Sequence, residues 1–246
     1  MFDYQAPEQH LKNRVILVTG AGDGIGRVAA INYAAQGATV ILLGRTPEKL
    51  DHVYDEIEAK GYPQPAIVPL NLESATEHDY IELANTLSQE FDQLDGILHN
   101  ASLLGVRTPL ESYDPVIWNQ VMQVNVTAPF MLTQALLPLL NNAEDASVIF
   151  TSSGVGRKGR AYWGAYAVSK FATEGMMETL ADELDNTSNI RVNCINPGAT
   201  RTQMRATAYP GEDPATLPTP QDIMPVYLYL MGADSKDCNG QSLNAQ

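Results

Sequence analysis

Residues 19–26 read Thr-Gly-Ala-Gly-Asp-Gly-Ile-Gly, and the architecture of the chain can be worked out from this stretch. It follows the apolar, β-branched run of residues 14–19, and a helical pattern continues from it through Ala35 and stops at Gly37. Glycines let a backbone turn tightly and approach a phosphate, while a helix N-terminus offers free N–H groups and the positive end of a dipole. A glycine-rich turn between a strand and a helix therefore predicts a dinucleotide site. The expected contacts in this turn are Gly20, Asp23, Gly24, Ile25 and Gly26.

Short apolar runs alternate with segments of helical spacing along the rest of the chain. The runs that we predict as strands are residues 14–19, 39–43, 66–70, 96–99, 147–151 and 191–195. Thr46-Pro47 and Gly61 mark the two ends of one intervening helix, and Thr219-Pro220 opens another. Because strands that alternate with helices build parallel sheets covered on both faces, we predict an α/β fold. The expected form is a doubly wound Rossmann sheet in a single domain over residues 1–246.

The composition narrows the classes of partner and the compartment. The formal net charge of −14 disfavours a phosphate backbone or an anionic membrane surface, so we expect no nucleic acid and no membrane as partners. No apolar stretch approaches the roughly 20 residues of a membrane helix, and the polar N-terminus lacks the apolar core of a signal peptide. Cys194 and Cys238 form no CxxC pattern, so we expect no metal site. These features predict a cytoplasmic protein.

Tyr166 and Lys170 are the candidates for proton chemistry. They are four residues apart in residues 161–184, a segment of helix-favouring composition, so both side chains lie on one face of the predicted helix. A free tyrosine has a pKa of roughly 10, which is too high for efficient proton exchange near neutrality. A lysine ammonium nearby favours the phenolate, so we expect Lys170 to lower the pKa of Tyr166. Tyr162 has no lysine four residues further on, so we expect it to shape the pocket or simply to pack.

The spacing Thr-Gly-x-x-x-Gly-x-Gly at residues 19–26 resembles the single-domain branch of the short-chain dehydrogenase/reductase family. The family's further motifs follow in order over essentially the whole chain: Asn100-Ala101, Asn125, Ser153, Tyr166-x-x-x-Lys170, Asn196-Pro197-Gly198 and Thr202. Each motif is modest alone, and their joint order carries the resemblance. It implies hydride transfer between a nicotinamide and a small-molecule carbonyl or alcohol substrate, with Tyr166 as the general acid or base.

The resemblance also implies roles for individual catalytic residues. Ser153, thirteen residues before Tyr166, is expected to bind and polarise the substrate carbonyl, and this spacing favours it over Ser152. Lys170 is expected to bond the nicotinamide ribose as well. Asn125 matches an asparagine that distorts its helix and holds a water in a proton relay, although a satisfied interior amide would look the same in the sequence.

The remaining cofactor contacts implied by the resemblance lie after the predicted strands. Asn71 stands where the family usually has an aspartate that receives the adenine amino group. The turn at Pro197-Gly198 is expected to pack against the nicotinamide, while the Thr200 backbone and the Thr202 hydroxyl hold its carboxamide. The full set of these contacts is Asn71, Leu72, Asn100, Ala101, Tyr166, Lys170, Pro197, Gly198, Thr200 and Thr202.

The residue after the second predicted strand indicates which dinucleotide binds. An acidic side chain there would bond the ribose hydroxyls and repel a 2′-phosphate, but this chain has Gly44-Arg45-Thr46. Arg45 can pair with a 2′-phosphate through a charge-assisted hydrogen bond worth about 1.5–3 kcal/mol. Asp23 acts against this preference, because many NADP-preferring relatives carry a basic residue at its position. The sequence thus favours NADP over NAD.

Several features leave alternatives open. His99 replaces an asparagine of the family, and we expect a satisfied structural histidine rather than a base. Residues 199–218 are expected to form a mobile lid, in which Arg201 and Arg205 keep an acidic substrate possible. The chain ends soon after residues 240–243, which leaves open how the C-terminal side of the pocket is closed.

Two further expectations concern assembly and the class of function. The resemblance implies a homodimer or homotetramer formed through the helices after the fourth and fifth strands. The alternative function is an NADPH-binding regulator with little turnover. Such proteins commonly lose the tyrosine or the lysine, whereas this chain keeps both Tyr166 and Lys170.

Overall fold

The computed structural model describes residues 1–246 and contains one seven-stranded sheet in the order β3-β2-β1-β4-β5-β6-β7. Every neighbouring pair is parallel. The strands are β1 (Val15–Thr19), β2 (Thr39–Gly44), β3 (Ala66–Pro69), β4 (Gly96–His99), β5 (Ala146–Thr151), β6 (Ile190–Asn196) and β7 (Ser242–Asn244). The six predicted strands are confirmed to within a residue at each end. The seventh was not among the predicted runs, because three residues with a single apolar side chain make no recognisable pattern.

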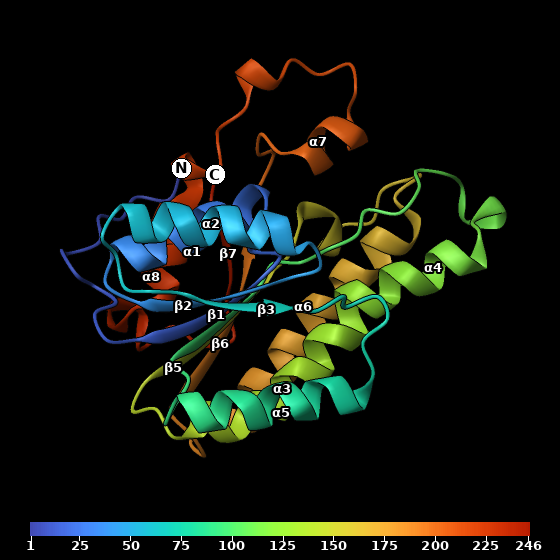
Figure 1. Ribbon diagram of the computed structural model, residues 1–246. Coiled ribbons are helices and arrows are strands. Elements are labelled where there is room, and N and C mark those ends of the chain that lie inside the picture. The colour runs from blue at the N-terminus through green and yellow to red at the C-terminus, as the bar shows by residue number, and fades with distance from the viewer.

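Helices cover both faces of the sheet (Figure 1), so the doubly wound fold is confirmed. On one face lie α1 (Gly24–Ala35), α2 (Pro47–Ala59) and α8 (Met224–Met231). On the other lie α3 (Glu77–Glu90), α5 (Ala128–Asn141) and α6 (Gly164–Leu184). The shorter helices are α4 (Pro115–Met122) and α7 (Gln203–Ala208), and α7 stands apart from the sheet in Figure 1. None of the helices is long and apolar enough to span a membrane.

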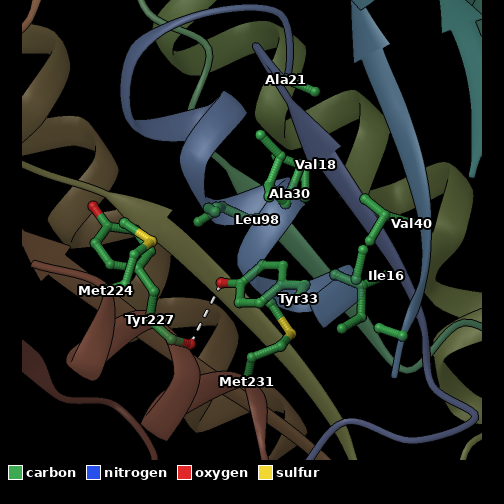
Figure 2. Packing of buried hydrophobic residues seen from close by; sticks show 14 of the residues in the cluster. Ile16, Val18, Ala21, Ala30, Tyr33, Val40, Leu98, Met224, Tyr227 and Met231 are labelled. Carbon is green, nitrogen blue, oxygen red and sulfur yellow. Dashed lines mark hydrogen bonds between the residues drawn. The ribbon is translucent and has the colours of Figure 1, made fainter. Parts of the chain in front are cut away.

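Side chains of the buried strands point alternately to the two helical layers. Ile16 and Val18 of β1 belong to the core beneath α1 and α8, whereas Leu17 between them belongs to the opposite core. Figure 2 shows the first core, where the Tyr33 hydroxyl of α1 donates to the Tyr227 carbonyl of α8 at 3.4 Å. Because both faces of the sheet are covered, its strands need apolar side chains at successive positions, which explains the continuous runs in the sequence.

The predicted helix boundaries hold with two corrections, at the starts of α8 and α6. α2 starts at Pro47 and ends before Gly61, whose φ of +71° breaks the helix as expected. The predicted start at Thr219-Pro220 is a 3₁₀ turn (Gln221–Ile223) that leads into α8. α6 begins at Gly164 instead of residue 161, because Tyr162 and Gly164 have φ values of +70° and +38° and turn the chain just before the helix.

The sheet order places two sets of loops at the same edge. The chain order reverses between β1 and β4, and in open parallel sheets ligands bind at the carboxyl ends of the strands beside such a reversal. Loops after β1, β2 and β3 lie on one side of this point, and loops after β4, β5 and β6 lie on the other. These two sets of loops enclose a cavity.

Candidate active site

A cavity of about 660 Å³ opens at the carboxyl ends of the strands. Its wall includes sixteen of the residues predicted from the sequence: Gly20, Asp23, Gly24, Ile25, Arg45, Asn71, Leu72, Asn100, Ala101, Ser153, Tyr166, Lys170, Pro197, Gly198, Thr200 and Thr202. Two predicted residues, Gly26 and Asn125, lie outside this wall. No group of three or more His, Cys, Asp or Glu side chains is arranged as a metal site requires.

The glycine turn has the shape that a pyrophosphate needs. Gly20 and Gly24 have φ values of +66° and +53°, which other residues rarely adopt. A Cβ on Gly26 would lie 2.3 Å from the Gly20 carbonyl oxygen and 2.6 Å from Asn100 Nδ2. Gly26 therefore lets α1 pack against the turn and is not itself part of the cavity wall. The turn leaves backbone surface bare at the start of α1, which suits a dinucleotide phosphate.

Asp23 is paired with a lysine that the sequence reasoning missed. Asp23 Oδ1 accepts a hydrogen bond from the Gly24 N–H at 2.7 Å, and its Oδ2 lies 2.5 Å from Lys49 Nζ of α2. The Lys49 ammonium holds the pKa of Asp23 below its usual value. Lys49 also lines the cavity and lies in the first turn of α2, shortly after Arg45. The carboxylate expected to oppose a 2′-phosphate is therefore neutralised by Lys49, a contact between distant segments that no local spacing in the sequence indicates.

A threonine hydroxyl fixes the loop that follows β4. Thr19 Oγ1, at the end of β1, accepts hydrogen bonds from the N–H groups of Asn100 and Ala101 at 3.0 Å each. Thr19 is buried, so these bonds are shielded from water. This cross-strand contact holds the two sides of the reversal point together, a role that the sequence analysis did not assign to Thr19.

Ser153, Tyr166 and Lys170 converge at the other end of the cavity. Tyr166 lies in the first turn of α6 and Lys170 in the next, with Lys170 Nζ 5.5 Å from the centroid of the Tyr166 ring. Lys170 Nζ donates to the Thr151 carbonyl oxygen at 2.8 Å. Ser153 lines the cavity and is half-buried, whereas Ser152 is buried and its hydroxyl donates to Glu174. The geometry thus favours Ser153 over Ser152 as the residue that meets a substrate.

The expected effect of Lys170 on Tyr166 is wrong for this structure. Burial raises the pKa of Tyr166 to about 12, and the hydrogen bond with Ser153 acts only weakly in the opposite direction. Burial also lowers the pKa of Lys170 to about 8. Desolvation dominates the pKa of both side chains, and the Lys170 ammonium is directed at the Thr151 carbonyl oxygen. Tyr166 is therefore protonated at neutral pH and can donate its proton.

Asn125 lies in a π-helical turn (Gln123–Thr127) between α4 and α5, so the expected helix distortion is confirmed. Its Oδ1 accepts from the Leu103 N–H at 2.7 Å. Its Nδ2 donates to the Leu103 carbonyl and to Ser169 Oγ, both at 2.9 Å. These bonds use both amide hydrogens and the oxygen, so the side chain is a satisfied interior amide. A water in a proton relay at this position would therefore have to bind the main chain of Asn125, since the side chain is already engaged.

His99 is a buried structural residue, but the expectation of a fully satisfied side chain is wrong for one of its ring nitrogens. Thr133 Oγ1 donates to the Pro129 carbonyl at 2.7 Å, so it accepts from His99 Nε2 at 2.8 Å. This arrangement fixes the neutral tautomer with its proton on Nε2 and leaves Nδ1 buried without a partner. The ring stacks on Phe150 with centroids 4.7 Å apart. Burial lowers the pKa of His99 to about 3.

The buried His99 predicts an acid-sensitive fold. Below a pH of about 6.5 the unfolded chain protonates this residue while the native state does not, so stability is lost from pH 6.5 down towards 3. This loss amounts to about 1.4 kcal/mol per pH unit for one group. We expect His99→Asn to flatten the fall in urea-unfolding free energy between pH 6.5 and 4.5. His52→Asn, at an exposed histidine of α2, is the control, and equal slopes in the wild type and His99→Asn would contradict the prediction.

The sequence left an acidic substrate possible through Arg201 and Arg205, but both arginines are engaged within residues 199–218. The Arg201 side chain donates to three main-chain carbonyls of the same segment, those of Pro214, Ala215 and Leu217 at 2.7–3.2 Å. Arg205 forms a two-point ion pair with Glu212 at 2.6 Å for each bond. Neither arginine is free to bind a substrate carboxylate.

The cavity end around Tyr166 is apolar and aromatic. A small buried cluster, distinct from the two main cores, consists of Val155, Trp163, Tyr166, Ala167 and Ala208, with Leu104, Met204 and Tyr209 packed against it. Arg107 packs against this cluster, since its guanidinium lies 5.1 and 4.9 Å from the centroids of the Trp163 and Tyr209 rings and donates to the Ala208 carbonyl. Trp163 thus forms part of the pocket wall, while Tyr162 is exposed.

The C-terminal residues brace the turn at Pro197, which lines the cavity. β7 pairs with β6, and Gln246 Nε2 donates to the Pro197 carbonyl at 2.7 Å and to Thr200 Oγ1 at 3.3 Å. The two termini lie near each other (Figure 1), joined by a hydrogen bond from the Phe2 N–H to the Ala245 carbonyl at 3.0 Å. The turn at Pro197 is therefore braced by the last residue of the chain.

The glycine turn, the reversal point and the convergence of Ser153, Tyr166 and Lys170 define a Rossmann-type oxidoreductase site. A family model described as short chain dehydrogenase matches residues 14–213. The chain belongs to the short-chain dehydrogenase/reductase family and is an NAD(P)-dependent oxidoreductase.

Its relatives place it near a bacterial group within that family. The chain is 56% identical over 243 residues to the uncharacterized oxidoreductase YciK of Escherichia coli K12, covering 99% of this chain and 96% of that protein. A solved structure from Pseudomonas syringae is 64% identical, with a TM-score of 0.98 and full coverage of both chains. A crystal structure from E. coli CFT073, complexed with NADPH, is 58% identical with a TM-score of 0.94, covering 98% of this chain and 100% of the other.

Proposed function

We propose that this protein is an NADP-dependent oxidoreductase that interconverts a carbonyl compound and an alcohol, with Tyr166 as the general acid and base. The observation that carries this proposal is the convergence of Ser153, Tyr166 and Lys170 at one end of a cavity whose other end is the glycine turn. When bound, the dinucleotide supplies or accepts the hydride. The whole chain, residues 1–246, acts as one Rossmann unit in this proposal.

The three side chains divide the proton chemistry among them. The Ser153 hydroxyl donates a hydrogen bond to the substrate carbonyl oxygen and polarises it. Tyr166 gives its proton to the same oxygen, and its high pKa keeps that proton in place until the oxygen becomes basic. The Lys170 ammonium stabilises the phenolate that remains and reaches the nicotinamide ribose. Alcohol oxidation uses the same groups in reverse. Asn125 positions the Leu103 main chain and Ser169 next to this centre.

NADP is proposed as the preferred dinucleotide. Arg45 lines the cavity after β2, and Lys49 stands beside it and neutralises Asp23. Relatives at 56% and 58% identity have been crystallised with NADP and NADPH. The adenine end is bordered by Asn71 and Leu72, although Asn71 Oδ1 also accepts from the Glu73 N–H at 3.2 Å. These observations support binding of a 2′-phosphate near Arg45.

Replacing Arg45 with alanine tests the cofactor preference. A lost charge-assisted hydrogen bond should lower the ratio of NADPH to NADH affinity by about tenfold to hundredfold. Tryptophan fluorescence titrations with both dinucleotides measure the two dissociation constants. Lys60→Ala, at another exposed lysine of the neighbouring segment, should leave the ratio unchanged. An unchanged ratio in Arg45→Ala would show that the assignment is wrong.

The substrate is proposed to be neutral and largely apolar at the end that enters the cavity. The wall around Tyr166 is formed by Leu104, Trp163, Met204 and Ala208, and the nearby arginines are engaged in the lid. A panel of aldehydes, ketones and alcohols can be assayed by NADPH absorbance. Within this panel, the enzyme should turn over keto esters faster than the matching keto acids, because the esters carry no charge. Binding of NADPH without turnover on any member of the panel would favour the alternative function, an NADPH-dependent regulator.

A homodimer or homotetramer in the cytoplasm completes the proposal. Phe130 of α5 is 50% exposed and Phe171 of α6 is 46% exposed, and both lie on helices that follow β4 and β5. Exposed aromatic side chains of this kind suit burial against a second copy. The cysteines are free thiols, which suits a reducing compartment. Sedimentation at micromolar concentration tests the assembly.

A further inference from the structure

A buried carboxylate lies directly behind the Tyr166–Lys170 pair. Glu174 follows Lys170 by one turn of α6 and is only 9% exposed. The proposed hydride transfer makes no use of it. A buried charge is costly unless it is paired and hydrogen-bonded, so its contacts indicate what it does there.

The first contact of Glu174 fixes the end of β5. Its Oε1 accepts a hydrogen bond from the hydroxyl of the buried Ser152. The N–H of Ser152 donates to the Ile195 carbonyl of β6 at 2.7 Å, so this residue is held from both sides. Ser152 stands between Thr151, whose carbonyl accepts from Lys170 Nζ at 2.8 Å, and Ser153, the proposed partner of the substrate carbonyl. One hydrogen bond to Glu174 thus constrains the main chain that presents both groups.

The second contact of Glu174 leads to the C-terminal strand. Arg157 Nε lies 3.4 Å from Glu174 Oε1 and supplies the countercharge. The same guanidinium donates to Asn244 Oδ1 at 2.8 Å and to Ser242 Oγ at 2.5 Å, both in β7. The carboxylate therefore connects α6, the end of β5 and the last strand of the sheet.

We propose that Glu174 is a positioning residue for the reaction: through Ser152 it holds the Thr151 carbonyl and Ser153 in place, and through Arg157 it ties them to β7. This inference rests on the proposed function. It also assigns an electrostatic task to Glu174, which supplies the negative charge that faces the Lys170 ammonium from within α6.

The surroundings of Lys170 support the electrostatic task. Burial lowers the pKa of Lys170 to about 8, while Cys194 of β6 and Glu174 act in the opposite direction. Burial raises the pKa of the Cys194 thiol well above its usual value, so this thiol is uncharged at neutral pH. Tyr166 is protonated there as well, and Arg157 adds only positive charge. Of the two groups that raise the pKa of Lys170, Glu174 is thus the one assigned the electrostatic task, since it follows Lys170 by four residues on the same face of α6.

Glu174→Gln removes the charge of the side chain but keeps its volume and one hydrogen-bond acceptor. We expect kcat to fall about tenfold to hundredfold, as small displacements of reacting groups do, with little change in KM for NADPH at pH 6.5. Without the carboxylate charge, the pKa of Lys170 should fall. We therefore expect kcat and NADPH affinity to decline at a lower pH in this variant than in the wild type. Ser152→Ala removes the hydrogen bond and keeps the charge, so it should lower kcat without shifting the pH of either decline.

Glu178→Gln is the matched control, since Glu178 is an exposed carboxylate one turn further along α6 and should give wild-type values throughout. Wild-type kcat and pH profiles in Glu174→Gln would overturn the proposal. If Glu174→Gln does not fold, Ser152→Ala provides the test. A wild-type kcat in Ser152→Ala would overturn the positioning role of Glu174. If the wild-type enzyme reduces nothing in the carbonyl panel, the proposed function fails. The pH dependence of NADPH affinity in Glu174→Gln, measured by fluorescence, then still tests Glu174 on its own.

Discussion

Tyr166→Phe should lower kcat for carbonyl reduction by about 10²–10⁴-fold while leaving the NADPH dissociation constant near its wild-type value. The phenol is the proton donor in the proposed reaction, and the substitution removes one oxygen without changing the ring that packs against Trp163. Stopped-flow absorbance of NADPH measures the rate, and a fluorescence titration measures the affinity.

Tyr162→Phe is the matched control for this prediction. Tyr162 lies four residues earlier and is exposed, so loss of its hydroxyl should leave both constants unchanged. Substantial reductase activity in Tyr166→Phe would remove Tyr166 from its proposed role, and weakened NADPH binding in that variant would show that the hydroxyl also holds the dinucleotide.

Lys170→Met should damage binding and rate together, which distinguishes it from Tyr166→Phe. Methionine keeps much of the buried side-chain volume but removes the ammonium that bonds the Thr151 carbonyl and, in the proposal, stabilises the Tyr166 phenolate. We expect kcat to fall by about 10²-fold or more and NADPH affinity to fall by about tenfold, the value of one charge-assisted hydrogen bond.

Lys158→Met, at an exposed lysine close in sequence, serves as the control and should leave both constants unchanged. A loss of rate with wild-type NADPH affinity in Lys170→Met would contradict the ribose contact. Because the pKa of Lys170 is about 8, NADPH affinity of the wild-type enzyme should itself weaken as the pH rises above 8, where Lys170 loses its charge.

The fold was predictable because its signals are local. Each buried strand is a continuous apolar run, and the turn at residues 19–26 places phosphate-binding backbone between a strand and a helix. The positions of Ser153, Tyr166 and Lys170 follow from spacing along the chain, and the structure brings these residues to one cavity end. β7 was not predicted, because its three residues gain their strand conformation from pairing with β6.

The remaining features of the site depend on contacts between distant segments. Asp23 looked unfavourable for a phosphate until Lys49 was found beside it on α2. Arg201 and Arg205 looked available to a substrate, but other residues of the segment 199–218 bind both. The pKa of Tyr166 was expected to fall because the lysine is visible in the sequence and the burial of both side chains is not. Desolvation is set by the whole tertiary structure, so no local pattern reports it.

The reversal of chain order between β1 and β4 has a consequence for how such enzymes diversify. Arg45 and Asn71, the proposed contacts of the adenosine end, precede β4, whereas Ser153, Tyr166 and residues 199–218 follow it. Genetic recombination within the β4 segment would therefore join the nucleotide preference of one parent to the substrate range of another. Besides the bonds from Asn100 and Ala101 to Thr19, such a junction must keep the two cores, which contain residues from both halves. Under the proposed roles, cofactor choice and substrate choice are therefore encoded in separate segments of the chain.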